Sequence, residues 1–251
     1  MVRAALPEAF VTRPLAHRGL HGPGVPENSL AAFRAAVDAG YGIECDLQPS
    51  ADGVAMVFHD PDLARMTGQP GAIATRPAAE LAALRLAGTD EGIPTFRALL
   101  DLVAGRVPLL VELKTQDLFT GENTGALEAS AVRDLAGYEG PLAFMSFNPH
   151  AVAAVARLAP DVPRGLTTWS WAPDPDEPVP PGLAAHLRGI PDYDGTGASF
   201  ISHEAADLGR PRVAELGAAG ARVLCWTITS PAQEAEARKV AENITFEGYR
   251  P

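Results

Sequence analysis

Three carboxylates fall near the ends of short apolar runs, at positions where they could share one site. In an extended strand, residues two apart project to the same side, so Glu44 and Asp46 of "GIECDL" point together. Glu112 occupies a matching place in "VPLLVEL". Hard oxygen ligands of this kind suit Mg²⁺, Ca²⁺ or Mn²⁺. The alternative is a set of solvated strand-end acids that pair with Arg18 and Lys114.

A turn signal brings a histidine back toward the first two carboxylates. Asp52 and Gly53 form the preferred centre of a two-residue hairpin loop, and the connection is far too short for the crossover that parallel strands need. The chain therefore returns antiparallel through "VAMVFH". With a two-residue loop, His59 lies directly opposite Asp46, with Cβ atoms roughly 4.5 to 5.5 Å apart. We therefore expect Glu44, Asp46 and His59 in one cluster.

Two histidines and two cations accompany the carboxylates. His17 and His59 are candidates for a general acid and base, because imidazole can donate or accept a proton near neutral pH. A core histidine satisfied by a carboxylate is the alternative for either of them. Lys114 follows Glu112 by two positions and therefore points to the same side. Arg18 and Lys114 could stabilise a phosphate beside a divalent cation, although a purely structural ion pair would leave the same pattern.

Four further residues carry weaker signals. Asn28 in "PENS" is expected to cap the helix that follows, and Glu27 either orients the site through a hydrogen bond or faces solvent. Trp226 could form an apolar wall for a substrate or belong to the core. His203 follows the sixth predicted strand and could line the pocket.

Short apolar runs alternate with amphipathic helical patterns along almost the whole chain. This alternation predicts an α/β fold, a (β/α)₈ TIM barrel with an extra β-hairpin after strand 2. We expect one domain over residues 1–251. Chemistry in such barrels lies at the C-terminal strand ends, where the residues above fall. The eight predicted strands cover residues 13–17, 42–47, 107–113, 142–147, 163–168, 198–202, 221–226 and 243–246.

The composition limits the partners. The chain has 20 basic and 31 acidic residues, a net charge of −11 and no basic stripe, which argues against nucleic-acid binding. It shows no secretory segment and no run near the roughly 20 apolar residues of a membrane span, so we expect a cytoplasmic protein without stable membrane insertion. Cys45 and Cys225 fall in predicted strands, which favours buried free thiols. Nothing in the sequence indicates an oligomeric state.

Five motifs occur in an order that is specific as a set: "LAHRGLHGPGVPENSLAAF", "GIECDLQPSADGVAMVFHD", "LLVELK", "SFNP" and "VLCWTIT". Together they resemble the glycerophosphodiester phosphodiesterases, a family of PLC-like TIM-barrel phosphodiesterases, over essentially the whole chain. The resemblance implies one bound divalent cation, Mg²⁺, Ca²⁺ or Mn²⁺. The implied site residues are the metal ligands Glu44, Asp46 and Glu112, the acid/base pair His17 and His59, and the substrate-binding residues Arg18, Lys114 and Trp226.

The resemblance also implies a reaction, the hydrolysis of a small-molecule glycerophosphodiester to sn-glycerol 3-phosphate and an alcohol. Whether a glycerol hydroxyl or water attacks first stays open, as does which histidine is the acid. A lysophospholipase-D-like enzyme or a sugar-phosphodiester hydrolase would use the same site. A binding module without chemistry would have lost a carboxylate or histidine, and none is missing.

Two departures and one loop complete the sequence interpretation. The family usually ends its last strand with Thr-Asp, whereas this chain has "ITFEGYRP", a difference that we expect to affect only a peripheral role. The segment between His59 and "IPTF" is short, so it predicts little of a cap-like insertion. The Pro- and Asp-rich loop 169–182 is expected to cover the barrel mouth, with Trp169 and Trp171 as its only candidates for membrane contact.

Overall fold

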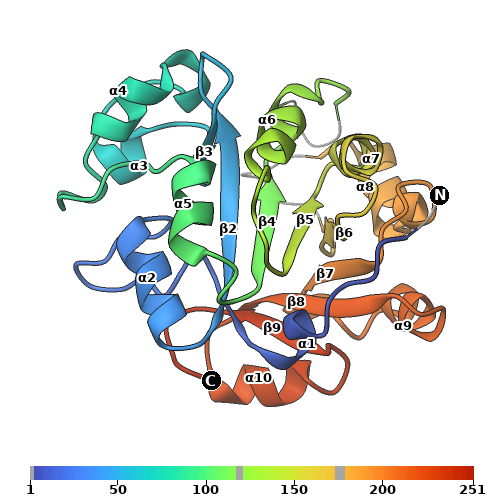
Figure 1. The fold of residues 1–251 in the computed structure, drawn as a ribbon. Coiled ribbons are helices and arrows are strands. Elements are labelled where there is room, and N and C mark those ends of the chain that lie inside the picture. Colours follow the sequence, from blue (N-terminus) through green and yellow to red (C-terminus); the bar gives the residue numbers. More distant parts are fainter. Residues whose placement is uncertain (1–2, 117–120, 173–178) are drawn as a thin grey trace.

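Eight parallel strands close into a barrel in the computed structural model, which describes residues 3–116, 121–172 and 179–251 (Figure 1). The ring closes because β1 pairs with both β2 and β9. The predicted TIM barrel is therefore confirmed, with every expected strand present. The barrel strands are β1 (Leu15–Ala16), β2 (Gly42–Pro49), β4 (Leu109–Leu113), β5 (Leu142–Ser146), β6 (Arg164–Thr168), β7 (Phe200–Glu204), β8 (Arg222–Ile228) and β9 (Asn243–Phe246).

Helices follow the strands and surround the barrel (Figure 1). Several begin at the polar caps that the sequence offers: Ser29, Thr95 and Ser230 each accept a hydrogen bond from a backbone N–H in the first turn. The helices are α1 (Ala9–Thr12), α2 (Leu30–Asp38), α3 (Ala64–Thr67), α4 (Ala78–Ala83), α5 (Phe96–Val103), α6 (Ala126–Asp134), α7 (Pro149–Leu158), α8 (Pro181–Arg188), α9 (Pro211–Ala218) and α10 (Pro231–Ala237), with the short 3₁₀ turns η1 (Ile73–Thr75), η2 (Pro191–Tyr193) and η3 (Ala205–Asp207).

The two faces of each barrel strand meet different surroundings. Outward residues pack with the helices in the main core, which includes the buried free thiols Cys45 and Cys225, as the sequence predicted. Inward residues such as Leu110, Phe200 and Leu224 fill the lower barrel. Phe10 of α1 joins this inner cluster. The polar side chains therefore lie at the other end of the barrel, where the C-terminal ends of the strands meet.

The hairpin after β2 is present, but its predicted register is wrong. The return strand β3 (Ala55–Val57) pairs antiparallel with β2, and Leu47 faces Val57. Ser50 N–H donates to the Val54 carbonyl at 2.9 Å, which leaves a loop of three residues, 51–53. Gly53 ends this loop with φ +77°, the left-handed conformation that closes three-residue hairpins. Because the extra residue shifts the pairing by one, Asp46 pairs with Phe58, whose N–H donates to the Asp46 backbone carbonyl, instead of facing His59.

The segment between β3 and α5, here called the β3–α5 excursion, forms more structure than its length suggested. Between β3 and α5 the chain makes α3, η1 and α4 before it rejoins the barrel (Figure 1). Met56, Phe58, Leu63, Ile73 and Leu81 bury their side chains in a separate small core there. The expectation of little insertion at this position is therefore corrected.

Residues 173–178 of the predicted mouth-covering loop lie outside the described residues, and α8 begins at Pro181. Among the residues that are described, no helix combines the length and the apolar character needed to cross a bilayer.

Candidate functional site

The eight residues predicted for catalysis, substrate binding and metal binding gather at one pocket of about 140 Å³ in the barrel mouth. They come from the barrel strands β1, β2, β4 and β8, from the hairpin strand β3, or from the turns that follow these strands. This convergence follows from the fold, because the C-terminal ends of parallel barrel strands meet at one face. The pocket is lined by His17, Arg18, Glu44, Asp46, His59, Glu112, Lys114 and Trp226, together with Met145, Phe147, Thr167, Thr227 and Thr245.

Three buried carboxylates lie close together on one side of the pocket. One oxygen from each of Glu44, Asp46 and Glu112 lies within 4.8 Å of the others. Burial raises the pKa of Glu44 well above its ordinary value, and the neighbouring charges of Asp46 and Glu112 raise it further. Three hard oxygen donors that repel one another at this distance fit a divalent cation such as Mg²⁺, Ca²⁺ or Mn²⁺.

Lys114 already supplies positive charge to this cluster. Its Nζ lies 2.8 Å from Asp46 and 2.6 Å from Glu112. Burial alone would raise the pKa of Asp46, but Lys114, His59 and Arg18 together lower it below its ordinary value. Burial alone would likewise lower the pKa of Lys114, but the two carboxylates raise it. The ammonium group therefore stays charged between the two carboxylates.

Asn28 holds Asp46 in place and is not a helix cap. Its Nδ2 donates to Asp46 Oδ2 at 2.9 Å, and its own φ of +53° turns the chain toward the site. Ser29 caps α2 instead, accepting from the Ala32 N–H. The prediction of Asn28 as the cap is therefore wrong by one residue, because serine is an equally good cap and frees the asparagine for the carboxylate.

His17 is oriented by a carboxylate that the sequence interpretation placed in a peripheral role. Glu247 Oε2 lies 2.7 Å from Nδ1 of His17 and 3.6 Å from Nε2 of His21. These two histidines lower the pKa of Glu247 well below its ordinary value. Glu247 follows β9 and shares the inward parity of Asn243 and Thr245, a signal that could have identified it.

His59 has a carboxylate partner of its own. Its Nδ1 lies 2.7 Å from Oδ1 of Asp60. Burial lowers the pKa of His59, although Asp46 opposes this effect. Both candidate acid/base histidines therefore have Nδ1 engaged by a carboxylate, which leaves Nε2 as the nitrogen available to a ligand. The two histidines are thus held in the same way, although His59 is not the residue that pairs with Asp46 across the hairpin.

An arginine of the β3–α5 excursion joins the two sides of the site. Arg65 makes two hydrogen bonds to Asp60, at 2.6 and 3.0 Å, and two to Glu27, at 3.0 and 2.7 Å. Glu27 also accepts from Arg18 Nη1 at 2.8 Å. Glu27 therefore turns inward. Of the two roles expected for it, the structure bears out the orienting hydrogen bond and not exposure to solvent. Arg65 carried no signal in the sequence interpretation.

Aromatic rings form the wall opposite the carboxylates. Trp226 packs edge-on against Phe147 with centroids 5.5 Å apart, and its Nε1 donates to the Ser202 carbonyl at 3.0 Å. Trp169 and Trp171 also pack edge-on against Phe147, with centroids 6.1 and 6.2 Å away. Trp171 is only 4% exposed, so it packs behind this wall and is not a surface contact for a membrane.

His203 belongs to the core behind the pocket and does not line it. It lies within β7 and is fully buried. Its Nδ1 lies 2.8 Å from the Thr168 hydroxyl, and its Nε2 lies 3.2 Å from Asp207. Outward parity in β7 explains this position, because the inward neighbours Ser202 and Glu204 alternate with it.

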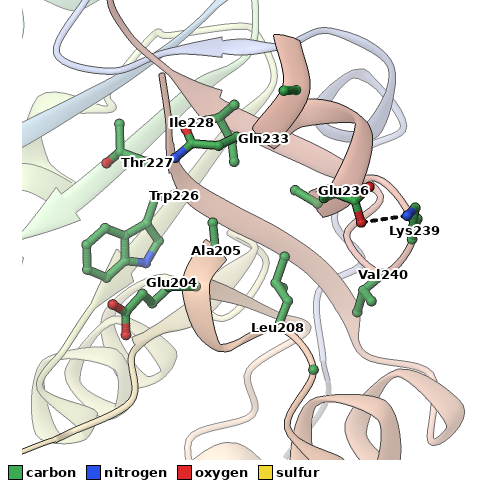
Figure 2. A pocket seen from close by; sticks show the side chains of 14 residues that line it. Glu204, Ala205, Leu208, Trp226, Thr227, Ile228, Gln233, Glu236, Lys239 and Val240 are labelled. Atoms are coloured by element: carbon green, nitrogen blue, oxygen red, sulfur yellow. Dashed lines mark hydrogen bonds and ion pairs between the residues drawn. The ribbon is translucent and has the colours of Figure 1, made fainter. Parts of the chain in front are cut away.

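A second hollow lies behind Trp226 (Figure 2). This groove of about 830 Å³ runs between η3 and α10. Figure 2 shows Ala205 and Leu208 on one side, Gln233 and Val240 on the other, and Trp226 at one end. It contains neither the histidines nor the three clustered carboxylates, so the chemistry belongs to the smaller pocket.

Comparison with known proteins agrees with this geometry. A family model described as the glycerophosphoryl diester phosphodiesterase family matches residues 17–243. A glycerophosphodiester phosphodiesterase of Caldanaerobacter subterraneus subsp. tengcongensis is 31% identical over 168 residues, which cover 62% of this chain and 66% of that relative. The alignment therefore spans about two thirds of the curated relative's length.

Solved structures share the fold over nearly all of the chain. An Oleispira antarctica phosphodiesterase in complex with the product sn-glycerol-3-phosphate has a TM-score of 0.77 and 26% identity, covering 95% of this chain and 94% of its own. A putative glycerophosphoryl diester phosphodiesterase from Silicibacter pomeroyi has a TM-score of 0.75 and 26% identity, covering 93% and 89%. The chain therefore belongs to the glycerophosphoryl diester phosphodiesterase family and is a phosphodiesterase, as its motifs predicted.

Proposed function

We propose that this protein hydrolyses glycerophosphodiesters to sn-glycerol 3-phosphate and an alcohol, with one divalent cation and a His17/His59 acid/base pair. The observation that carries the proposal is the single pocket of about 140 Å³ that both histidines, Arg18 and Lys114 share with the three carboxylates. The Oleispira antarctica phosphodiesterase of the same fold is solved with sn-glycerol-3-phosphate bound.

The donor set fits the cation that the family implies. Glu44, Asp46 and Glu112 would hold it, since all three are buried and their oxygens converge. A cation bound there would polarise a phosphodiester oxygen and offset charge that develops on the phosphoryl group. Mg²⁺, Mn²⁺ and Ca²⁺ all suit oxygen ligands, and the choice among them is a matter for experiment.

The chain's own charged groups bind and orient the phosphate. Arg18 and Lys114 provide the positive charge next to the carboxylates, and charge-assisted hydrogen bonds to a phosphate are the strong ones. Glu27 fixes the Arg18 guanidinium from behind, and Asp46 fixes the Lys114 ammonium. Both cations therefore meet the substrate with little freedom left to lose.

The two histidines move the protons. With Nδ1 held by Glu247 or Asp60, each ring presents Nε2. One histidine takes the proton of the attacking hydroxyl and the other gives a proton to the leaving alcohol. The nucleophile is either the neighbouring glycerol hydroxyl or water.

The test is release of sn-glycerol 3-phosphate from glycerophosphocholine and glycerophosphoethanolamine. Reactions contain Mg²⁺, Mn²⁺, Ca²⁺ or EDTA, and the variants are Glu44→Gln and His17→Ala. We expect cation-dependent release by the wild type and a loss of at least about 100-fold in each variant, because both act directly on the reaction. Glu80→Gln, an exposed carboxylate of α4, is the matched control and keeps wild-type activity.

Two outcomes would contradict the proposal. Release that EDTA leaves unchanged would remove the cation from the reaction. A folded wild type that releases nothing with any cation would remove glycerophosphodiesters as substrates, and lysophospholipids or sugar phosphodiesters would be assayed next. We further propose that residues 1–251 act as one domain. We also propose that the protein works in the cytoplasm, which fractionation of the native source would test.

A further inference from the structure

Two threonine hydroxyls lie in the pocket without a hydrogen-bond partner in the described part of the chain. Thr167 on β6 and Thr245 on β9 line the same pocket as the histidines. Thr167 is 3% exposed and Thr245 is 1% exposed. A buried hydroxyl without a partner costs free energy, so a fold keeps one only where something else is gained.

Strand parity directs both side chains into the barrel. On β6, Leu166 packs in the outer core and Thr168 bonds to His203, so Thr167 between them faces inward. On β9, Ile244 and Phe246 pack in the same outer core, so Thr245 faces inward too. The two hydroxyls therefore lie on the enclosed floor of the pocket.

The two hydroxyls come from other strands than the carboxylates and Lys114. The carboxylates and Lys114 come from β2, β4 and the residue after β4, whereas Thr167, Trp226 and Thr245 come from β6, β8 and β9. A phosphate held by Arg18 and Lys114 has two ester arms. The glycerol arm is small, polyhydroxylated and common to all glycerophosphodiesters, whereas the other alcohol varies in size. The enclosed floor therefore suits the glycerol, and the open mouth suits the variable alcohol.

We propose that Thr167 and Thr245 are specificity-determining residues that hydrogen-bond the glycerol hydroxyls. The inference deepens the proposed function and depends on it only in taking a glycerol phosphate ester as the ligand. A site that hydrogen-bonds a substrate hydroxyl discriminates against an analogue that lacks it, because the buried group is then left unpaired. These two hydroxyls would make the pocket prefer glycerol phosphate to an alkyl phosphate of the same length.

Binding of two product analogues tests this without any chemical step. Isothermal titration calorimetry with Mg²⁺ compares sn-glycerol 3-phosphate with propyl phosphate, which keeps the phosphate and the three-carbon chain but has no hydroxyl. The variants are Thr167→Val and Thr245→Val, which preserve shape. Ser202→Ala is the matched control, because Ser202 Oγ is also buried without a partner among the described residues but does not line the pocket.

We expect the wild type to bind sn-glycerol 3-phosphate more tightly than propyl phosphate. Each valine variant should lose roughly 3- to 10-fold in affinity for sn-glycerol 3-phosphate and keep its affinity for propyl phosphate, since one hydrogen bond is lost from one ligand. Ser202→Ala should match the wild type with both ligands. Equal losses for both ligands, or no loss for either, would overturn the assignment.

The outcomes separate this inference from the proposed function. Hydrolysis of glycerophosphocholine is measured on the same preparations. If hydrolysis fails but the valine variants still erase the preference for sn-glycerol 3-phosphate, the subsite stands and the reaction does not. If hydrolysis succeeds but the preference is unchanged in the variants, the reaction stands and the threonines are structural.

Discussion

Oε2 of Glu247 lies 2.7 Å from Nδ1 of His17, across the seam where β9 meets β1 and closes the barrel. The seam joins the first and last strands, so residues 230 positions apart in the sequence meet at the site. A carboxylate on Nδ1 fixes both the tautomer and the orientation of an imidazole. The last strand therefore does more than complete the ring, because it supports a candidate acid/base residue.

Glu247→Gln should lower kcat on the order of 10- to 100-fold, because the amide weakens the hold on the His17 ring and small misplacements are costly. Steady-state hydrolysis of glycerophosphocholine measures the effect, with far-ultraviolet circular dichroism to verify folding. Glu236→Gln, an exposed carboxylate on neighbouring α10, is the control and should behave as wild type. Unchanged kcat in Glu247→Gln would show that the ring is held by other contacts.

Arg65 should act as a positioning residue for both His59 and Arg18. Its guanidinium binds Asp60 and Glu27 with two hydrogen bonds each, a geometry that lysine does not reproduce. We expect both Arg65→Ala and Arg65→Lys to lower kcat/KM about tenfold or more. The loss of unfolding free energy should stay below about 1 kcal/mol, because the side chain is half exposed.

Arg85→Ala is the matched control for Arg65, because Arg85 makes an exposed ion pair with Asp90 in the same excursion. It should leave both activity and stability unchanged. If Arg65→Lys retained full activity, one positive charge would suffice and the double bidentate geometry would have no role. If Arg65→Ala lost activity only in proportion to its loss of folded protein, its role would be structural.

The buried imidazole of His203 should make stability fall in acid. Burial lowers its pKa, although Asp207 opposes the effect, so the folded state takes up a proton less readily than the unfolded state. Above about pH 6.5 the residue is neutral in both states. As pH falls below that value the unfolded state binds the proton first, and the unfolding free energy decreases.

Urea unfolding at pH 7.5, 6.5 and 5.5 measures this contribution. His203→Asn keeps a polar contact for Thr168 but has no proton to gain, so its unfolding free energy should decrease less between pH 7.5 and 5.5 than that of the wild type. Asp207 and Arg210, the charged groups that face this imidazole, are present in both proteins. Parallel curves for the two proteins would contradict a buried neutral His203.

The strands were predictable from sequence, and the way they pair locally was not. Each barrel strand appears in the sequence as a short apolar run between turn and helix signals. The presence of eight such runs predicts that the sheet closes into a barrel. The hairpin register depended on one residue of loop length. Asp52 and Gly53 fit both a two- and a three-residue loop, and the hydrogen bond from Ser50 N–H to the Val54 carbonyl distinguishes the longer loop.

The site was predictable where its residues sit on strands, and less so where they act through a neighbour. Glu44, Asp46 and Glu112 follow strand parity. Arg65 and Asp60 depend on how an irregular excursion folds back, which no periodicity records. Asn28 looked like a cap because its side chain suits that role, but the adjacent serine took it. Local chemistry was identified correctly there, and the tertiary partner was not.

A glycine on β6 occupies a position where the barrel interior should not tolerate a larger side chain. Gly165 pairs directly with Phe200 on β7, and a Cβ at Gly165 would lie 2.4 Å from the Phe200 ring. The ring is fully buried in the lower barrel cluster, so it has no free direction in which to move. Gly165→Ala should therefore lower the unfolding free energy by about 1 to 3 kcal/mol, the usual cost of overpacking.

Gly217→Ala provides the comparison, because Gly217 lies within α9 and its added Cβ would meet only Val223 at an ordinary 3.7 Å. Alanine there should leave stability unchanged or raise it by about 0.5 to 1 kcal/mol, since glycine is a poor helix former. Urea unfolding of both variants measures the difference.

Because Phe200 lies below the pocket floor, a shift of its ring in Gly165→Ala would also disturb Thr167 two positions along β6. We therefore expect this variant to weaken sn-glycerol 3-phosphate binding as well as stability, and a variant as stable as wild type would show that the Phe200 ring has room to yield.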